Sequence, residues 1–372
     1  MKNTLRIAIG VVTLVSLAAC SGGESGPLKI GFVGPLTGDA AALGIDMLNG
    51  MKLAVQEINA NGGMNGHVVE IIAEDGRCTP AEAVNGFQKL VNVDHVSGII
   101  GGLCSGETLA GAPIAEAAKV VMISPGSSSP KITTAGTYVY RNYPSDAFKG
   151  VAMAKYFKQK GYAKVAIITH NTDYATGLRD AIVQNVGAEN VVFNETVEET
   201  TKDFRSLLSR LRKMDFDVFV PNMQTDGAAG ALVAQYREQE LTAPIVGTDT
   251  TDSLAVAEIA GDAAEGVQLV NVPSAGEGTS FEQKFVAAFQ KPQSSISWAA
   301  YSYDATGILL EALAKGEGDP EKVKAHLDLH PGYAGVIGTF RFDENGDVVG
   351  ATYVVKEFKD GAIVTVGDIT LD

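Results

Sequence analysis

The residues GGLCSGET at positions 101–108 combine small side chains, a cysteine and hydroxyl groups directly after the apolar run 96–100. Ser105 and Gly106 stand where a helical pattern over 107–119 begins. The first turn of a helix has unpaired N–H groups and a positive dipole potential, and both attract an anion. We therefore expect this turn to bind a carboxylate, with the hydroxyl of Ser105 as a further donor. Taken alone, Ser105 is equally consistent with a residue that only caps its own helix.

A second polar loop, 125–130, carries Gly126, Ser127 and Ser128 and follows the next apolar run. Its hydroxyls and carbonyls offer donors and acceptors to the same small polar ligand when the two loops meet. This second loop favours a ligand site over a simple helix cap at Ser105.

Asp249 follows a later apolar run and offers a carboxylate to a cation. A buried ammonium group must be paired, because an unpaired buried charge is strongly unfavourable. The alternative is that Asp249 caps the helical segment near 253–260, but Asp252 is better placed for that cap. We therefore expect Asp249 to serve the ligand and its replacement to leave stability nearly unchanged. An anion subsite at Ser105 and a cation subsite at Asp249 together fit a zwitterion.

These polar loops lie between short apolar runs that alternate with amphipathic segments of helix length. The predicted strands are 28–33, 68–74, 96–100, 120–124, 165–169, 191–196, 218–221, 244–247 and 266–271. Helical periodicity is clear over 44–59 and 203–213. The alternation predicts an α/β fold with parallel sheets that helices cover on both faces. Ligands of such sheets bind beyond the carboxyl ends of the strands, where these loops and those of Tyr174 and Gln224 lie.

Nine or ten strands exceed one compact sheet, and the roughly 345 residues after position 27 suit two domains. Breaks in the alternation at 138–146, 272–278 and around 343–347 are candidate crossings between the domains. We expect two doubly wound domains, one formed by 28–143 with 274–345 and the other by 144–273 with 346–372. Asn345-Gly346 predicts a hairpin turn and not a calcium loop, because the glycine is one position too early for an EF-hand.

Residues 1–19 have the pattern of an export signal, with Lys2 and Arg6, an apolar stretch, and Ala18-Ala19 before Cys20. The ending LAAC followed by SGG resembles a lipobox, in which the cysteine is lipidated; the alternative is an ordinary signal that is cleaved nearby. We expect a lipid on Cys20 and a flexible tether over 20–27. No later apolar run reaches the ~20 residues of a membrane-spanning helix.

Lipidation of Cys20 leaves Cys78 and Cys104 as an even pair in an oxidising compartment. A disulfide between them contributes about 3–4 kcal/mol in the chain-entropy account. The alternative is two inert buried thiols.

Composition and motifs exclude several function classes. The formal charge is −15, or −17 once Lys2 and Arg6 are removed, and nucleic-acid binding requires basic patches instead. The sequence contains no G-x-S-x-G elbow, no P-loop lysine and no dinucleotide fingerprint after the first strand. His326 and His330 are four residues apart but have no evident third ligand, so we interpret them as surface residues near a helix end. We expect no catalytic residue, no metal and no cofactor.

Several motifs occur in one order over some 340 residues. They are IGFVGPLTG (30–38), INANGGMNG (58–66), GLCS (102–105), ISP with the serines that follow (123–129), KDF (202–204) and IGTFRFD (337–343). In this order they resemble the leucine/isoleucine/valine-binding proteins of bacterial ABC importers, which are type I periplasmic binding proteins. The resemblance implies two Rossmann-like lobes joined by a three-strand hinge, which close on one amino acid.

The resemblance also implies roles for single residues. The ligand carboxylate meets a serine hydroxyl and amide at Ser105, and the ammonium meets Gly126, Ser128 and Asp249. Tyr174 lines the second lobe, and a cysteine pair like Cys78 and Cys104 is bridged in the family.

The sequence departs from the family where the ligand side chain lies. Leu43 and Gln224 stand where branched-chain binders place aromatic residues, and Asp249 is one methylene shorter than the usual glutamate. Leu103 and Cys104 complete the set that we expect to contact the ligand. We expect an extracytoplasmic, monomeric binding protein that delivers a branched-chain amino acid to permease subunits. The alternatives are a polar or larger amino acid, a small amide or an organic acid as ligand, or a ligand-sensing role.

Overall fold

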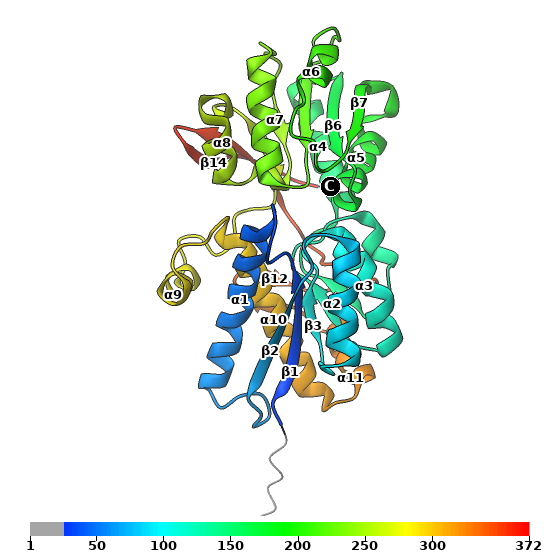
Figure 1. The fold of residues 1–372 in the computed structure, drawn as a ribbon, viewed down its shortest axis with the longest axis vertical. Coiled ribbons are helices and arrows are strands. Elements are labelled where there is room, and N and C mark those ends of the chain that lie inside the picture. Colours follow the sequence, from blue (N-terminus) through cyan, green and yellow to red (C-terminus); the bar gives the residue numbers. More distant parts are fainter. Residues whose placement is uncertain (1–25, 372) are drawn as a thin grey trace, which may run out of the picture.

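The computed structural model describes residues 26–371, which form two lobes arranged one above the other in Figure 1. The predicted signal segment, Cys20 and most of the predicted tether lie outside the described residues. None of the helices in the described part of the chain is long and apolar enough to cross a membrane.

The first lobe is built on a parallel five-stranded sheet in the order β2-β1-β3-β4-β5. Its strands are β1 (Leu28–Gly34), β2 (Val69–Asp75), β3 (Ile99–Gly101), β4 (Met122–Ser124) and β5 (Val139–Arg141). Its helices are α1 (Ala41–Ala60), α2 (Pro80–Asn92), α3 (Ser105–Ala118), α9 (Ser280–Phe289), α10 (Ile296–Gly316) and α11 (Pro320–Asp328). A short 3-10 helix, η1 (Pro130–Thr134), and the hairpin β11 (Tyr333–Gly335) and β12 (Gly338–Phe340) belong to the same lobe.

The second lobe contains a three-stranded sheet in the order β7-β6-β8 and a four-stranded sheet in the order β9-β10-β13-β14, which an isolated bridge between Phe219 and Ile245 connects. Its strands are β6 (Val165–His170), β7 (Val191–Val197), β8 (Val218–Asn222), β9 (Val246–Gly247), β10 (Gln268–Asn271), β13 (Tyr353–Lys359) and β14 (Ala362–Ile369). The last two strands are antiparallel, whereas the others are parallel. The helices are α4 (Asp146–Lys160), α5 (Asp173–Val186), α6 (Arg205–Leu211), α7 (Asp226–Glu238) and α8 (Leu254–Ala260), with the 3-10 turns η2 (Ala188–Asn190), η3 (Asp249–Thr251) and η4 (Gly261–Ala264).

The chain passes between the lobes three times, as expected. The first two crossings lie between β5 and α4 and between β10 and α9. The third follows Val348, because Phe342 pairs with Val348 and Arg141 with Asp347 in the first lobe. The predicted boundary at 345/346 therefore falls too early, inside a hairpin turn of the first lobe. That turn itself is confirmed, since Oδ1 of Asp343 accepts from the backbone N–H groups of Asn345 (2.9 Å) and Asp347 (3.0 Å).

The prediction of an α/β fold with two parallel, helix-covered sheets is confirmed. The nine predicted strands all occur, although β3, β4, β9 and β10 are shorter than predicted. The sequence analysis missed β5, which is three residues long, and the antiparallel pairs β11 with β12 and β13 with β14, which have no helix between their strands. Most helices begin after a serine or threonine whose side chain accepts a backbone N–H, as the N-cap preference predicts.

A buried ion pair holds the first and third crossings together. Arg141 is fully buried, and its Nε and Nη2 donate to Oδ1 (2.6 Å) and Oδ2 (2.9 Å) of Asp347. Nη1 donates to the carbonyl of Ser129 (2.8 Å), which belongs to the second polar loop. The hinge and the loop that carries Ser128 are thus fixed to the same guanidinium group.

Candidate functional site

A cavity with about 420 Å³ of empty space, part of which is open to solvent, lies between the lobes and is the candidate site. We call it the central cavity. Its lining from the first lobe is Ala40, Leu43, Leu103, Cys104, Ser105, Gly126, Ser128 and Trp298, and from the second lobe Tyr174, Gln224, Asp249 and Thr250. Small-molecule sites are concave and mostly apolar, with a few convergent polar groups. The central cavity has these properties.

Nine of the eleven predicted ligand-binding residues line the central cavity, and two do not. Ser127 is buried behind the loop, where its Oγ contacts Thr108 Oγ1 (2.7 Å) and donates to the carbonyl of Leu103 (3.0 Å). Gly106 lines a separate cavity that also contains Cys78, Thr172 and Glu199. Neither residue lines the central cavity: Ser127 ties two loops together, and Gly106 borders the neighbouring cavity instead.

Ser105 is the first residue of α3 and is buried. Its Oγ accepts a hydrogen bond from the backbone N–H of Ser129 (3.1 Å). The hydroxyl proton therefore stays available, because no acceptor for it lies among residues 26–371. Cys104, and not Ser105, is the N-cap of α3, and its backbone N–H is bound by Oε2 of Glu107 (3.0 Å). The alternative that Ser105 caps its own helix is thus wrong.

Ser128 has the opposite hydrogen-bonding state. Its Oγ donates to Oδ2 of Asp146 (2.7 Å), and the backbone N–H of Asp146 donates to the carbonyl of Ser128 (2.7 Å). With its proton engaged, the hydroxyl of Ser128 offers only lone pairs to the cavity. Gly126 allows this loop to pack closely, since a Cβ there would lie 2.5 Å from Leu103 Cδ1.

Asp249 lies at the start of η3, is only 6% exposed, and has two differently engaged oxygens. Oδ1 accepts from the phenol of Tyr143 (2.7 Å) and from Nζ of Lys149. Oδ2 is buried and has no hydrogen-bond partner in the described part of the chain. One carboxylate oxygen at the cavity is therefore still unpaired.

Asp249 also accepts hydrogen bonds from Lys149 and Tyr143, which argues against the expectation that its replacement leaves stability nearly unchanged. Asp252 does not cap the following helix either. The N-cap of α8 is Ser253, whose Oγ accepts from the backbone N–H of Ala255 (3.3 Å). Asp252 instead pairs with Lys356. That ion pair lines a different cavity, together with Tyr143, Asn271 and Ser297.

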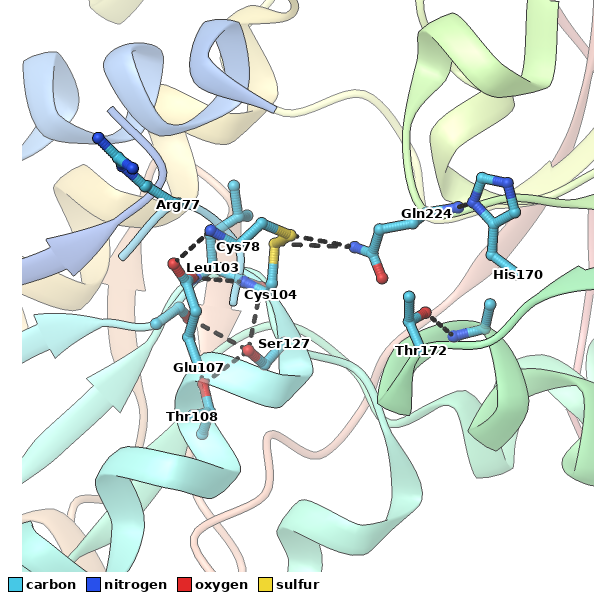
Figure 2. Close-up of a disulfide and its surroundings, with 12 residues drawn as sticks. Arg77, Cys78, Leu103, Cys104, Glu107, Thr108, Ser127, His170, Thr172 and Gln224 are labelled. Atoms are coloured by element: carbon cyan, nitrogen blue, oxygen red, sulfur yellow. Dashed lines mark hydrogen bonds between the residues drawn. A yellow bond between two sulfur atoms is a disulfide. The ribbon is translucent and has the colours of Figure 1, made fainter. Parts of the chain in front are cut away.

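A disulfide between Cys78 and Cys104 forms one wall of the central cavity, so the pairing expected for these cysteines is present. Figure 2 shows Gln224 reaching across from the second lobe, with Nε2 3.4 Å from Sγ of Cys78 and 3.7 Å from Sγ of Cys104. The backbone N–H of Gln224 donates to Nδ1 of His170 (3.1 Å). Burial lowers the pKa of His170 to about 4, so the ring stays neutral and keeps this acceptor.

Glu107 lies behind the disulfide and does not reach the cavity. Its Oε1 accepts from the backbone N–H of Cys78 (3.0 Å), and its Oε2 accepts from those of Leu103 and Cys104 (3.0 Å each). Burial raises the pKa of this carboxyl to about 7, despite the three hydrogen bonds that favour the charged form. Glu107 thus fixes the two loops that the disulfide joins.

The sequence analysis missed Ala40, Thr250 and Trp298 in the lining and Lys149 behind it. Trp298 is the single tryptophan of the chain and lies in the first turn of α10, 5.3 Å from the ring centroid of Tyr143. Because Trp298 is the single tryptophan and lies near the start of a helix, the sequence could have indicated its place in the lining. Lys149 lacks such a signal, because its spacing from Asp146 on α4 also fits a solvent-exposed ion pair.

A third possible metal ligand, the carboxylate of Glu311, does lie beside His326 and His330, contrary to expectation. Oε1 of Glu311 lies 3.1 Å from Nε2 of His326 and 3.3 Å from Nε2 of His330. The backbone N–H of Gly332 donates to Nδ1 of His330 (3.2 Å), which places the proton of the neutral ring on Nε2. The cluster is therefore consistent with histidines that donate to Glu311, and a metal would have to displace that proton.

The arrangement of lobes, crossings and central cavity agrees with the comparisons to known proteins. The profile of the family described as periplasmic binding protein matches residues 27–362. The chain belongs to this family. Its members are extracytoplasmic solute-binding proteins and not enzymes.

Individual relatives cover nearly the whole chain. An amino acid binding protein of Pseudomonas aeruginosa is 30% identical over 371 residues, which cover 96% of this chain and 97% of the relative. The structure of a leucine binding protein, LivK of Thermotoga maritima, superposes with a TM-score of 0.84 at 27% identity and covers 92% of this chain and 98% of its own. LivJ of Streptococcus pneumoniae, solved in complex with isoleucine, has a TM-score of 0.81 at 28% identity, with coverages of 92% and 99%.

Proposed function

We propose that this protein is the solute-binding component of an ABC importer and binds one free α-amino acid as a zwitterion in the central cavity. A branched-chain aliphatic amino acid is the ligand that the cavity supports best. The carrying observation is that Asp249, whose buried Oδ2 has no partner in the described part of the chain, lines one small cavity together with Ser105 and Ser128.

The hydrogen bonds of the two serines assign the two ends of the ligand. Ser105 has a free proton to donate and lies in the first turn of α3, where the helix dipole favours a negative charge, so it suits the carboxylate. Ser128 has only lone pairs to offer and lines the same cavity as Asp249, so it suits the ammonium. A zwitterion satisfies both ends at once.

The remaining walls suit an aliphatic side chain. Leu43, Leu103, Trp298 and the disulfide present apolar surface. The names of the similar proteins, which include leucine and isoleucine binders, support this choice. Gln224 supports the alternative of a polar or larger amino acid, because its carboxamide stands at one end of the cavity.

Binding is coupled to closure of the lobes. The ligand first meets Ser105 and Ser128 on the first lobe, and closure adds Tyr174, Gln224 and Asp249 from the second. Ion pairs between Lys131 and Asp173 (2.8 Å) and between Lys202 and Asp39 (2.7 Å) then join the lips of the cleft. These pairs are exposed, so each contributes at most about 1 kcal/mol. Contacts with the ligand therefore supply most of the free energy that favours the closed form. Micromolar affinity corresponds to a binding free energy of about 8 kcal/mol.

The assignment to an importer extends to its surroundings. A lipid on Cys20 anchors a monomeric protein at the membrane, and the closed form docks on permease subunits. The signal pattern before Cys20 supports the anchor, and the family supports the permease.

Calorimetric titration of the purified domain with each of the twenty standard amino acids tests the proposal. We expect saturable binding of leucine, isoleucine or valine with one site per chain. Binding of a polar amino acid instead would select the alternative ligand class. A flat response to all twenty would contradict the proposed function.

A further inference from the structure

A fully buried lysine stands directly behind the amine end of the proposed site. Lys149 lies one turn into α4 and is 1% exposed. Its Nζ donates to Oδ1 of Asp249 and contacts Oδ1 of Asn271 (3.3 Å). The lysine thus engages one oxygen of Asp249 and leaves Oδ2 without a partner among the described residues.

A second buried carboxylate belongs to the same group. Asp146 is 0% exposed, and its Oδ1 lies 3.9 Å from Nζ of Lys149. That oxygen has no hydrogen-bond partner in the part of the chain that the structure describes, whereas Oδ2 accepts from Ser128. Lys149 therefore stands between one carboxylate on the first turn of its own helix and one from η3.

We call Asp146, Lys149 and Asp249 the buried charge cluster. Two carboxylates and one ammonium give it a formal charge of −1. The neighbouring charged groups are already paired: Arg141 with Asp347, and Lys356 with Asp252. The cluster consequently lacks one positive charge, and both of its unpaired oxygens are acceptors.

We propose that the buried charge cluster selects ligands that carry a single positive charge at the amine end, and that Lys149 sets this requirement. The inference rests on the proposed function and specifies the ligand's charge class. An ammonium group brings the buried charge cluster to neutrality and gives Oδ2 of Asp249 a donor. An acid without the ammonium, such as a 2-oxo acid, leaves a net negative charge buried, which is unfavourable unless a proton is taken up.

The proposal differs from a purely structural role for Lys149 in a measurable way. A structural role predicts that variants change stability and affinity for all ligands alike. A charge-setting role predicts that the preference for an amine over its oxo analogue follows the net charge of the cluster.

The test measures the dissociation constants of L-leucine and of its 2-oxo acid, 4-methyl-2-oxopentanoate, by calorimetry. If the screen of twenty amino acids selects another one, that amino acid and its own 2-oxo acid replace the pair. Wild type, whose cluster charge is −1, is expected to bind the amino acid at least 100-fold more tightly than the 2-oxo acid. Asp146→Asn, with a cluster charge of 0, is expected to lower this preference at least tenfold. The double variant Asp146→Asn/Lys149→Met returns to −1 and is expected to regain the wild-type preference.

Asn keeps an acceptor for the hydroxyl of Ser128 in these variants, so the two variants differ mainly in charge. An equal preference in wild type, Asp146→Asn and the double variant would overturn the proposal.

A measurement on wild type alone covers the case in which the variants do not fold. Titrations in buffers of different ionisation enthalpy report the protons taken up on binding. We expect none for leucine and about one for the 2-oxo acid, or no binding of the oxo acid at all. Binding of the oxo acid with leucine-like affinity and no proton uptake would overturn the inference. Failure of all twenty amino acids to bind would instead contradict the proposed function itself.

Discussion

Replacement of Asp249 by asparagine tests the amine end of the site. The variant keeps the shape of the side chain and an oxygen for Lys149 and Tyr143, but it places an amide NH2 where Oδ2 stood. That group is a donor and faces the ammonium of the ligand, which is also a donor. The ligand loses a charge-assisted hydrogen bond, worth about 1.5–3 kcal/mol, and meets an uncompensated buried donor in its place.

The total loss of binding free energy is about 3–4 kcal/mol, which is the range for breaking one side of a buried charge pair. This corresponds to a rise in the dissociation constant of roughly 10²–10³-fold. The variant also loses stability without ligand, because Lys149 is fully buried and loses its ion pair with Asp249, while Oδ1 of Asp146 lies 3.9 Å away. Burial already lowers the pKa of Lys149 to about 8, so loss of its proton offsets part of this cost.

Calorimetry well below the melting temperature separates the two effects, with Asp252→Asn as the matched control. Asp252 is also a partly buried carboxylate paired with a lysine, but it does not line the central cavity. The control is expected to lose stability and to bind within a few-fold of wild type. Binding by Asp249→Asn within tenfold of wild type, or equal losses in both variants, would refute the assignment of Asp249 to the ammonium.

Three further predictions concern the wall around the disulfide. Glu107 has a folded-state pKa of about 7 against an ordinary value of 4.5, so the folded protein binds more protons between these values and its free energy of unfolding falls as pH rises from 4.5 to 7. The fall is about 3 kcal/mol. Chemical denaturation at pH 4.5 and pH 8 should therefore show a smaller difference in the free energy of unfolding for Glu107→Gln than for wild type. An equal pH dependence in both proteins would contradict the role of the buried carboxyl. The double variant Cys78→Ser/Cys104→Ser should lose about 3–4 kcal/mol in denaturant unfolding, and full retention of stability would mean that Glu107 alone holds the loops. Gln224→Ala removes the side chain that separates the central cavity from the cavity containing Cys78 and Glu199. Calorimetry should then show a several-fold rise in the affinity for methionine relative to valine. An unchanged ratio would show that Gln224 does not limit the length of the ligand side chain.

The fold was largely predictable because its signals are local. Strand and helix alternation and the strand-end position of the polar loops follow from hydrophobic periodicity. The short strand β5 was not predicted, because three residues carry little periodicity. The pair β13 and β14 was not predicted either, because an antiparallel pair breaks the alternation of strands and helices.

The site was predictable where one strand end determines a residue's position. Ser105, Ser128 and Asp249 are in the cavity for this reason. Ser127 and Ser128 are neighbours in one loop, however, and the sequence does not tell which of them turns toward Thr108 and which toward the ligand. Lys149 was not predictable, because its burial results from the packing of α4 against η3 and β10, which are about 100 residues further along the chain.

A crystal structure of the protein with its bound amino acid tests the central claim most directly. We predict a carboxylate oxygen of the ligand within hydrogen-bond distance of Ser105 Oγ, and its ammonium nitrogen within the same distance of Ser128 Oγ and Asp249 Oδ2. A ligand bound with its two ends exchanged, or one that leaves Asp249 Oδ2 without a contact, would contradict the account.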